Sequence, residues 1–196
     1  MEAYADLKSF VRDIDGLLGS GSATEAIVNG VKNRLSELIR TRPVLPESVR
    51  APGGGDYARH LLYQDPSGRF EIVIMAWSPG QATPVHDHSG IWCVEGVVDG
   101  VIDVTRYDVT EGAHPGTARM EALEVIRAGL GECGALIPPV EFHRIANPYP
   151  SPALTLHVYG GRMRSCRVFT ERPDGGFDVA TRELGFASPE AALSSC

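Results

Sequence analysis

The N-terminal segment alternates apolar and polar positions with the period of an α-helix. Apolar residues recur at i, i+3, i+4 and i+7 in two stretches, which Gly19-Ser20-Gly21 separates. The stripes comprise Leu7, Phe10, Val11, Ile14, Leu17 and Leu18, then Ile27, Val28, Val31, Leu35, Leu38 and Ile39. Ser22 and Glu25 form a capping-box pattern before the second stretch. This pattern predicts a helical hairpin whose apolar stripes are packing faces.

Beyond the hairpin the pattern changes to short apolar runs separated by turns. Residues 43–55 are rich in proline and glycine and are predicted to be a linker. The predicted strands are 59–63, 70–77, 101–107, 122–127, 134–137, 142–145, 153–159 and 166–169. Strands at this spacing predict a closed antiparallel barrel or jelly roll with a small-molecule site in its mouth. We expect one structural domain, in which residues 1–55 pack on a barrel formed by residues 56–196.

Composition narrows the class of protein. A chain of 196 residues with 43% hydrophobic residues can bury the core of one globular domain. The net charge of -7 argues against nucleic acid and anionic membrane surfaces as partners. We see no membrane span and no secretory signal pattern at the N-terminus. The four cysteines are widely spaced and form no C-x-x-C pair, so we expect a reducing, cytoplasmic location.

The segment His86-Asp87-His88 carries the clearest chemical signal in the chain. Histidines at i and i+2 on an extended segment point to the same side, whereas Asp87 points to the other. A third histidine from another strand, His143, can complete a trio around one divalent metal ion. Such a site leaves coordination positions open, where substrates can bind. We therefore predict these three histidines as metal ligands.

The surroundings of these histidines resemble the two sequence motifs of the cupins. Gly80 and Gly100 flank the first motif at the usual distances, and Asn147 follows His143 as in the second. The chain departs from the pattern at Cys93, where cupins usually have a glutamate ligand, and at Val140, where a glycine is usual. A cupin with three histidines and this cysteine resembles the cysteine dioxygenase family of thiol dioxygenases. That resemblance implies a mainly β cupin barrel (double-stranded β-helix or jelly roll) with an N-terminal helical hairpin.

The resemblance also implies a substrate site and a polar relay. Arg59 and Tyr57 match the segment whose arginine binds the substrate carboxylate in that family. Thr155, His157 and Tyr159 match its hydroxyl, histidine and tyrosine relay, and they share one face of a predicted strand. Without the resemblance, the pattern also fits His157 as a hydrogen-bonded core histidine, which is the default in an apolar strand. It likewise fits Arg59 as a solvated strand residue.

Two further expectations come from the resemblance alone. Cys93 and Tyr159 occupy the positions that form a thioether cross-link in the animal enzymes. The cofactor is expected to be Fe(II), whose full double charge three neutral imidazoles would leave intact. The partners are then a small thiol and O2, and the product is a sulfinic acid. The oligomeric state is left open, and a monomer is compatible with the sequence.

The sequence leaves several alternatives for the substrate. Arg59 and Cys93 favour the branch that oxidises L-cysteine, whereas Tyr159-Gly160-Gly161 resembles the bacterial branch that oxidises mercaptopropionate. A cluster of arginines could add a second anion contact and favour mercaptosuccinate: Arg162, Arg164 and Arg167. Two other classes of protein also explain the histidines, namely a carbon-cleaving cupin oxygenase and a non-catalytic metal-binding cupin. The first leaves Arg59, Cys93 and the pair His157 and Tyr159 without roles, and the second predicts stable metal content but no oxygen uptake with any thiol.

Overall fold

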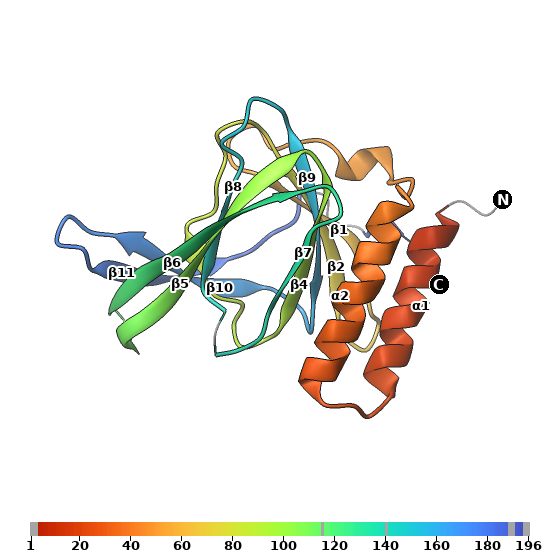
Figure 1. Cartoon of the computed structure of the whole chain (residues 1–196), viewed down its shortest axis with the longest axis horizontal. Helices are drawn as coiled ribbons and strands as arrows, with labels where there is room; N and C mark the ends of the chain where they lie inside the picture. Colours follow the sequence, from red (N-terminus) through yellow and green to blue (C-terminus); the bar gives the residue numbers. More distant parts are fainter. Residues whose placement is uncertain (1–3, 115, 140, 188–190, 194–196) are drawn as a thin grey trace.

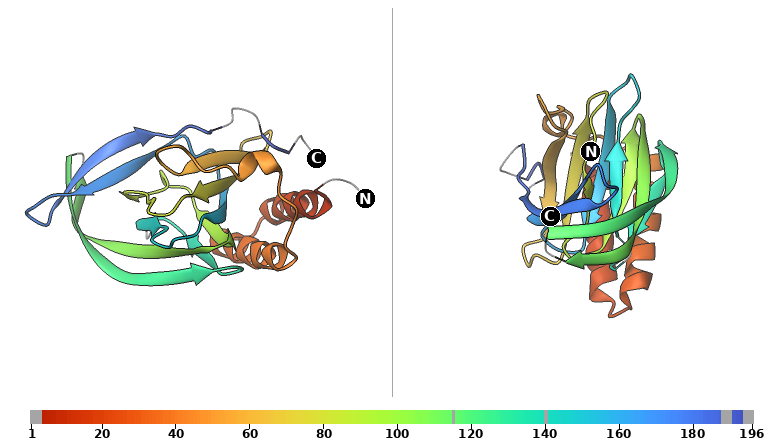
Figure 2. Two further views of the ribbon diagram at one scale, coloured as in Figure 1. Left: turned by 90° about the horizontal axis from the view of Figure 1, so that it is seen from above. Right: turned by 90° about the vertical axis from the view of Figure 1, so that its left-hand side faces the viewer.

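The computed structural model describes residues 4–114, 116–139, 141–187 and 191–193. It is mainly β, with two helices packed against one face of a sheet (Figure 1). The rest of the strands enclose the space on the other side of that sheet (Figure 2). The predicted β-barrel with an N-terminal helical hairpin is thus confirmed. Within the ranges given above, no helix is long and apolar enough to cross a membrane.

The hairpin consists of α1 (Ala5–Gly19) and α2 (Thr24–Arg40), and both predicted stripes supply its buried residues. The predicted capping box is wrong. Ala23 is the N-cap of α2 and no side chain caps it. Ser22 pairs instead with Ser20, and the two hydroxyl oxygens are 2.9 Å apart. The serine hydroxyl is therefore used within the turn between the two helices.

The segment predicted as a linker is partly structured. It contains a short 3-10 helix, η1 (Glu47–Val49), and its side chains Leu45 and Val49 are buried with the helical hairpin. The carbonyl of Ala51 lies 2.7 Å from Nε2 of His60, a buried residue of the first strand. These contacts fasten the connection between hairpin and barrel, so it packs as part of the core.

The strands form two antiparallel sheets. The first has the order β1-β2-β9-β4-β7, with bounds Ala58–Gln64, Glu71–Trp77, Ala153–Tyr159, Cys93–Asp99 and Cys133–Leu136. The second has the order β10-β11-β6-β5-β8-β3, with bounds Ser165–Glu171, Phe177–Glu183, Gly116–Gly129, Val101–His114, His143–Ala146 and Val85–His86. Because β3 also pairs with β10, the second sheet closes into a barrel.

The structure differs from the predicted strands at four places. β4, which carries Cys93, was not among the predicted strands. β5 and β6 form a hairpin that continues well beyond the predicted 101–107 and 122–127. β3 has two residues, too few for a pattern to reveal. β11 was not predicted, because residues 177–183 alternate only weakly and most of its side chains are exposed or half-buried. Pairing with β10 and β6 holds it in the sheet.

The central strand β9 positions the chemistry, since its two faces meet different surroundings. Leu154, Leu156 and Val158 join the core beneath the helices. The alternate residues Thr155, His157 and Tyr159 point into the barrel, and every residue of the strand is buried. Helices cover one face and the second sheet covers the other, so polar side chains on this strand are placed inside the molecule.

The close approach of α2 to β4 at Gly96 gives a test of this packing. A Cβ atom there would lie 2.7 Å from both Cys133 Sγ and Ile39 Cδ1. We expect Gly96→Val to lower the free energy of unfolding by about 1–3 kcal/mol, because overpacking outweighs the strand preference of valine. Gly134→Val is the matched control, since the nearest atom to its added Cβ is 3.8 Å away. Equal urea stabilities of both variants would contradict the close packing.

Candidate metal centre and adjoining pocket

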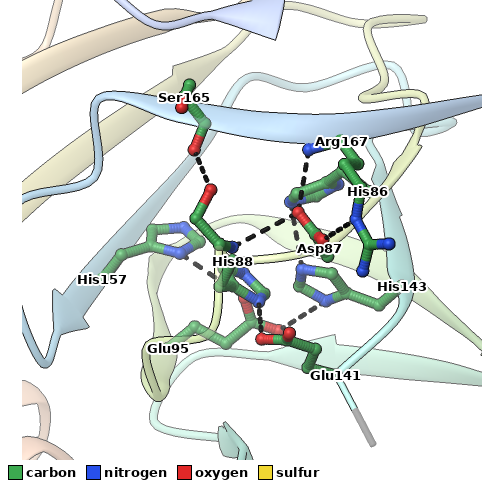
Figure 3. Close-up of polar contacts among 10 residues, drawn as sticks. His86, Asp87, His88, Glu95, Glu141, His143, His157, Ser165 and Arg167 are labelled. Carbon is green, nitrogen blue, oxygen red and sulfur yellow. Dashed lines mark hydrogen bonds and ion pairs between the residues drawn. The ribbon is translucent and has the colours of Figure 1, made fainter. Parts of the chain in front are cut away.

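Three histidines meet inside the barrel (Figure 3). His86 ends β3 and stands directly opposite His143, the first residue of β8. His88 follows two residues after His86, and one ring nitrogen from each of the three lies within 4.8 Å of the others. The Nε2 atoms of His86 and His143 are 3.2 Å apart. The structure therefore brings together the three histidines that the sequence predicted as ligands.

The opposite ring nitrogens of these histidines face acceptors. His86 Nδ1 lies 3.1 Å from the carbonyl oxygen of Pro84. His143 Nδ1 is 3.5 Å from Glu95 Oε1, and His88 Nδ1 is 3.7 Å from Glu141 Oε2. Protons on Nδ1 would suit these partners and would leave Nε2 lone pairs facing one another.

Burial favours that arrangement, because it lowers the pKa of His86 and of His143 well below the usual value. Both rings are neutral near pH 7, and two facing lone pairs repel each other. A cation between them removes the repulsion, and neutral imidazole is the form that binds metals. The donor set and its protonation fit a divalent metal ion.

Asp87 lies between two of these histidines and points away from them, as expected. Its carboxylate accepts hydrogen bonds from the backbone N–H of Arg167 at 2.8 Å and from Arg167 Nε at 2.6 Å. Ser89 Oγ also donates to the Ser165 carbonyl at 2.6 Å (Figure 3). These bonds fasten the segment of the histidines to β10, so Asp87 has a positioning role.

Two members of the predicted relay, Thr155 and His157, are joined by a hydrogen bond, and Tyr159 contacts His157 through its ring. Trp77 Nε1 donates to Thr155 Oγ1 at 2.9 Å, and that hydroxyl lies 2.7 Å from His157 Nε2. The indole can only donate, so the hydroxyl accepts from Trp77. His157 Nδ1 faces the acceptor Glu95 Oε2 at 3.4 Å, which favours a proton on that nitrogen, and the Thr155 hydroxyl then donates to the bare Nε2. The His157 and Tyr159 rings are stacked, with centroids 6.0 Å apart.

Cys93 and Tyr159 face each other across the β4–β9 pair as directly opposed residues. Both are buried, and burial raises the pKa of the Cys93 thiol and of the Tyr159 hydroxyl well above their ordinary values. Both groups are therefore protonated near pH 7. Side chains opposed in this way have Cβ atoms about 5 Å apart, which is within reach of a covalent link.

Arg59 is a buried cation with donors to spare. Its side chain packs over the Phe186 ring, 5.0 Å from the centroid, and Nη1 donates to the Gly185 carbonyl at 3.2 Å. Nε and Nη2 are buried and have no hydrogen-bond partner. A buried guanidinium with unpaired donors is costly, so it is suited to an anion that arrives with a ligand.

A narrow pocket of about 20 Å³ joins Arg59 to His86 of the trio. Its lining includes Tyr57, Arg59, His86 and Tyr159, and Tyr57 stacks on Trp77 with centroids 4.7 Å apart. A larger cavity of about 330 Å³ opens elsewhere, between β4 and β6, and reaches Glu95 and Thr155. Of the two, only the smaller pocket adjoins both a histidine of the trio and Arg59.

The arginine cluster considered from the sequence lies outside this pocket. Arg164 Nη1 binds Glu71 at 3.1 Å, and Arg167 binds Asp87. The second arginine that lines the pocket is Arg182 of β11, which sequence reasoning missed. Its strand was not predicted, so nothing in the pattern brought it near Arg59. Arg182 Nη2 also forms an ion pair with Asp56 at 3.0 Å.

Sequence reasoning also missed two glutamates. Glu95 follows Cys93 by two residues, and Glu141 precedes His143 by two residues. The spacing i±2 from predicted site residues was a usable signal, because it places a side chain on the same face of an extended segment. Both carboxylates are buried beside the histidines (Figure 3).

Comparisons with known proteins agree with the sequence resemblance. The model of a family described as "Cysteine dioxygenase type I" matches residues 55–172. Cysteine dioxygenase type 1 of Danio rerio is 26% identical over 117 residues, which cover 59% of this chain and 57% of that protein. The Homo sapiens protein of the same name is 27% identical over 145 residues, covering 71% and 70%. The chain thus spans little more than half the length of the first relative.

Similar solved structures include two from bacteria. An uncharacterized conserved protein with a double-stranded beta-helix domain, from Klebsiella pneumoniae, has a TM-score of 0.45 at 18% identity and covers 61% of this chain and 91% of its own. TT1209 from Thermus thermophilus has a TM-score of 0.45 at 23% identity and covers 61% and 97%.

The buried His157 predicts a pH dependence of stability. Burial lowers the pKa of His157 to about 3, whereas the unfolded chain takes up the proton near pH 6.5. Below pH 6.5 the unfolded state binds more protons, so stability is lost as the pH falls. We expect the stability advantage of the metal-free protein over His157→Gln to shrink by about 2 kcal/mol between pH 7.5 and 5.0. Urea unfolding with chelator measures it, and a constant difference would contradict the buried neutral ring.

Proposed function

The chain belongs to the cysteine dioxygenase family, and from this premise we propose that it is a non-haem Fe(II) thiol dioxygenase. It adds both atoms of O2 to the sulfur of a small carboxylated thiol, most simply L-cysteine, and yields the sulfinic acid. One observation carries the proposal: a narrow pocket is lined both by His86 of the histidine trio and by a buried arginine that has unpaired donors. A metal-binding group and an anion-binding group thus adjoin one pocket.

His86, His88 and His143 would hold the iron through one nitrogen each. Bound Fe(II) would supply open coordination positions at which a thiolate and O2 meet, which removes the entropic barrier to their encounter. The protein contributes rigidity to this end of the pocket. β3 is hydrogen-bonded to both β8 and β10 there, and Asp87 bonds the segment between His86 and His88 to Arg167 of β10.

Arg59 would bind the carboxylate of the substrate. Nε and Nη2 lie on one edge of a planar guanidinium and can donate two parallel hydrogen bonds to one carboxylate. Tyr57 lines the same pocket and is suited to donate a third. Its pKa is raised by burial, so the phenol keeps its proton near pH 7. Fixing the carboxylate at this end would direct the thiol toward the histidines.

Tyr159 would act beside the reacting sulfur. Its hydroxyl is protonated near pH 7, its ring centroid lies 6.0 Å from that of His88, and it lines the pocket. It can therefore donate a hydrogen bond to developing negative charge there. Thr155 and the stacked His157 hold the tyrosine in place, and the low pKa of His157 keeps that ring uncharged.

Arg182 favours a second candidate substrate, a thiol with two carboxylates such as mercaptosuccinate. An outer hollow of about 320 Å³ shares Tyr57, Arg59, Arg182 and Leu184 with the narrow pocket. A second carboxylate extending into it would meet Arg182. The present partner, Asp56, forms only an exposed ion pair, which is worth about 1 kcal/mol or less. A monocarboxylate such as cysteine or mercaptopropionate would not use this contact.

The function is tested by oxygen consumption after reconstitution with Fe(II). We expect uptake with a carboxylated thiol, chosen from cysteine, mercaptopropionate and mercaptosuccinate, and a sulfinic acid product 32 mass units heavier than the thiol. The Arg59→Gln variant should raise KM for that substrate about 30-fold, the equivalent of about 2 kcal/mol for hydrogen bonds to a charged group. Activity with cysteamine, which lacks a carboxylate, serves as the control and should respond little.

The contrary outcomes are distinct. Oxygen uptake with acetylacetone but with no thiol would favour the carbon-cleaving class of cupin. Stable metal binding without uptake on any substrate would favour the non-catalytic class. Unchanged kinetics of Arg59→Gln would remove Arg59 from the site. Arg182→Gln decides between substrates, since it should impair only a dicarboxylate.

We also propose that Cys93 and Tyr159 form a thioether during turnover. The bond joins Sγ to a ring carbon, and the two hydrogens and two electrons lost are taken up by O2. Intact mass should fall by about 2 mass units after incubation with iron, thiol and O2, with a cross-linked peptide in the digest. Cys93→Ser is the control and should keep its mass. An unchanged mass of the turning-over wild type would refute the cross-link.

A further inference from the structure

We propose that Glu95 and Glu141 are positioning residues of the metal centre, which orient His143 and His88 and supply the two negative charges that balance a bound dication. The inference rests on the proposed metal site but not on the substrate. It assigns a role to two residues that neither the sequence motifs nor the resemblance singled out.

Geometry gives the first argument. Glu95 and Glu141 are 6% and 4% exposed, and each faces the Nδ1 atom of one histidine, at 3.5 Å from His143 and 3.7 Å from His88. One carboxylate oxygen of each glutamate and both Nδ1 atoms are buried without a hydrogen-bond partner. Glu141 Oε2 and His88 Nδ1 form one facing pair of unsatisfied atoms. The unsatisfied His143 Nδ1 faces Glu95 Oε1, whereas the unsatisfied oxygen of Glu95, Oε2, faces His157. A shift of a few tenths of an ångström would turn these glutamate–histidine contacts into hydrogen bonds. Histidines that bind metals commonly donate their second N–H to a carboxylate in this way.

Charge gives the second argument. The other buried carboxylates have guanidinium partners: Asp65 has Arg69, Glu71 has Arg164, and Asp87 has Arg167. The ionic contacts found for Glu95 and Glu141 in the described ranges are with imidazoles instead.

An imidazole that binds a metal ion is neutral, so the His143 ring that Glu95 shares with the trio brings no charge of its own. Lys32 and Arg106 line the cavity beside Glu95, and Arg106 already binds Glu124 at 3.4 Å. Burying two carboxylates without cations is costly. A divalent ion bound by the same histidines would provide the missing positive charge. One imidazole ring would separate it from each carboxylate.

The two glutamates differ in one respect. Glu95 also lies 3.4 Å from Nδ1 of His157, so a single carboxylate joins a metal ligand to the tyrosine relay. Glu141 contacts only the ligand His88 among the histidines described. Loss of Glu95 should therefore disturb the orientation of both His143 and His157, whereas loss of Glu141 should weaken metal binding alone.

The test is a Co2+ titration of the metal-free protein, followed by visible absorbance and by the rise in Tm on metal binding. We expect Glu95→Gln and Glu141→Gln each to weaken Co2+ binding by about 10- to 100-fold. Glu71→Gln is the matched control, because this glutamate is fully buried but paired with Arg164. It should lower the Tm of the metal-free protein and leave Co2+ affinity unchanged.

Leucine variants separate charge from orientation. Glutamine keeps an acceptor for Nδ1–H and removes the charge, whereas Glu95→Leu and Glu141→Leu remove both. Weakened binding in the glutamine variants supports charge balance, and further weakening in the leucine variants supports orientation. If a leucine variant does not fold, the glutamine pair still decides.

Two results would overturn the inference: wild-type affinity in both glutamine variants, or an equal loss in Glu71→Gln. Failure of the wild type to bind any Co2+ would instead contradict the proposed function.

Discussion

The pairing of β3 with β8 is the constraint on which the candidate site depends. It sets His86 directly opposite His143 and brings two Nε2 atoms to 3.2 Å from each other. β3 has only two residues, so its position is fixed by neighbours: it pairs with β8 on one side and β10 on the other. The Asp87–Arg167 bonds reinforce the second contact. Closure of the barrel at this point keeps the Nε2 lone pairs of His86 and His143 close together, although they repel each other.

The burial of β9 on both faces explains how polar chemistry is kept inside a small protein. Its alternation sends apolar residues beneath the helices and Thr155, His157 and Tyr159 into the barrel. Trp77 donates to Thr155 at one end of the relay, and Glu95 lies 3.4 Å from His157 Nδ1. Burial keeps His157 uncharged and Tyr159 protonated. The helical hairpin thus serves the site indirectly, by covering the outer face of the sheet that carries the relay.

The distribution of charge differs from the simplest expectation for three imidazoles around a dication. Three neutral ligands would leave the ion its full charge, yet Glu95 and Glu141 stand immediately behind two of them. Negative charge is present near the metal position but does not occupy a coordination position. At the other end of the pocket Arg59 is buried without an anion. The molecule therefore has two carboxylates without guanidinium partners behind the histidines and a guanidinium without an anion at Arg59. The first suits a metal cation, and the second suits the carboxylate of a substrate.

The sequence alone determined the helical hairpin, most of the strands and the histidine trio, because these follow from local periodicity and from i, i+2 spacing. It did not determine β11, because the residues of that strand alternate only weakly. For the same reason it did not place Arg182 at the pocket. Nor did it reveal that Arg164 and Arg167 are committed to Glu71 and Asp87. Only the tertiary structure decides such partners. Ion pairs and buried contacts join residues far apart in the chain, and a strand's alternation fixes the face of a side chain but not what lies across from it.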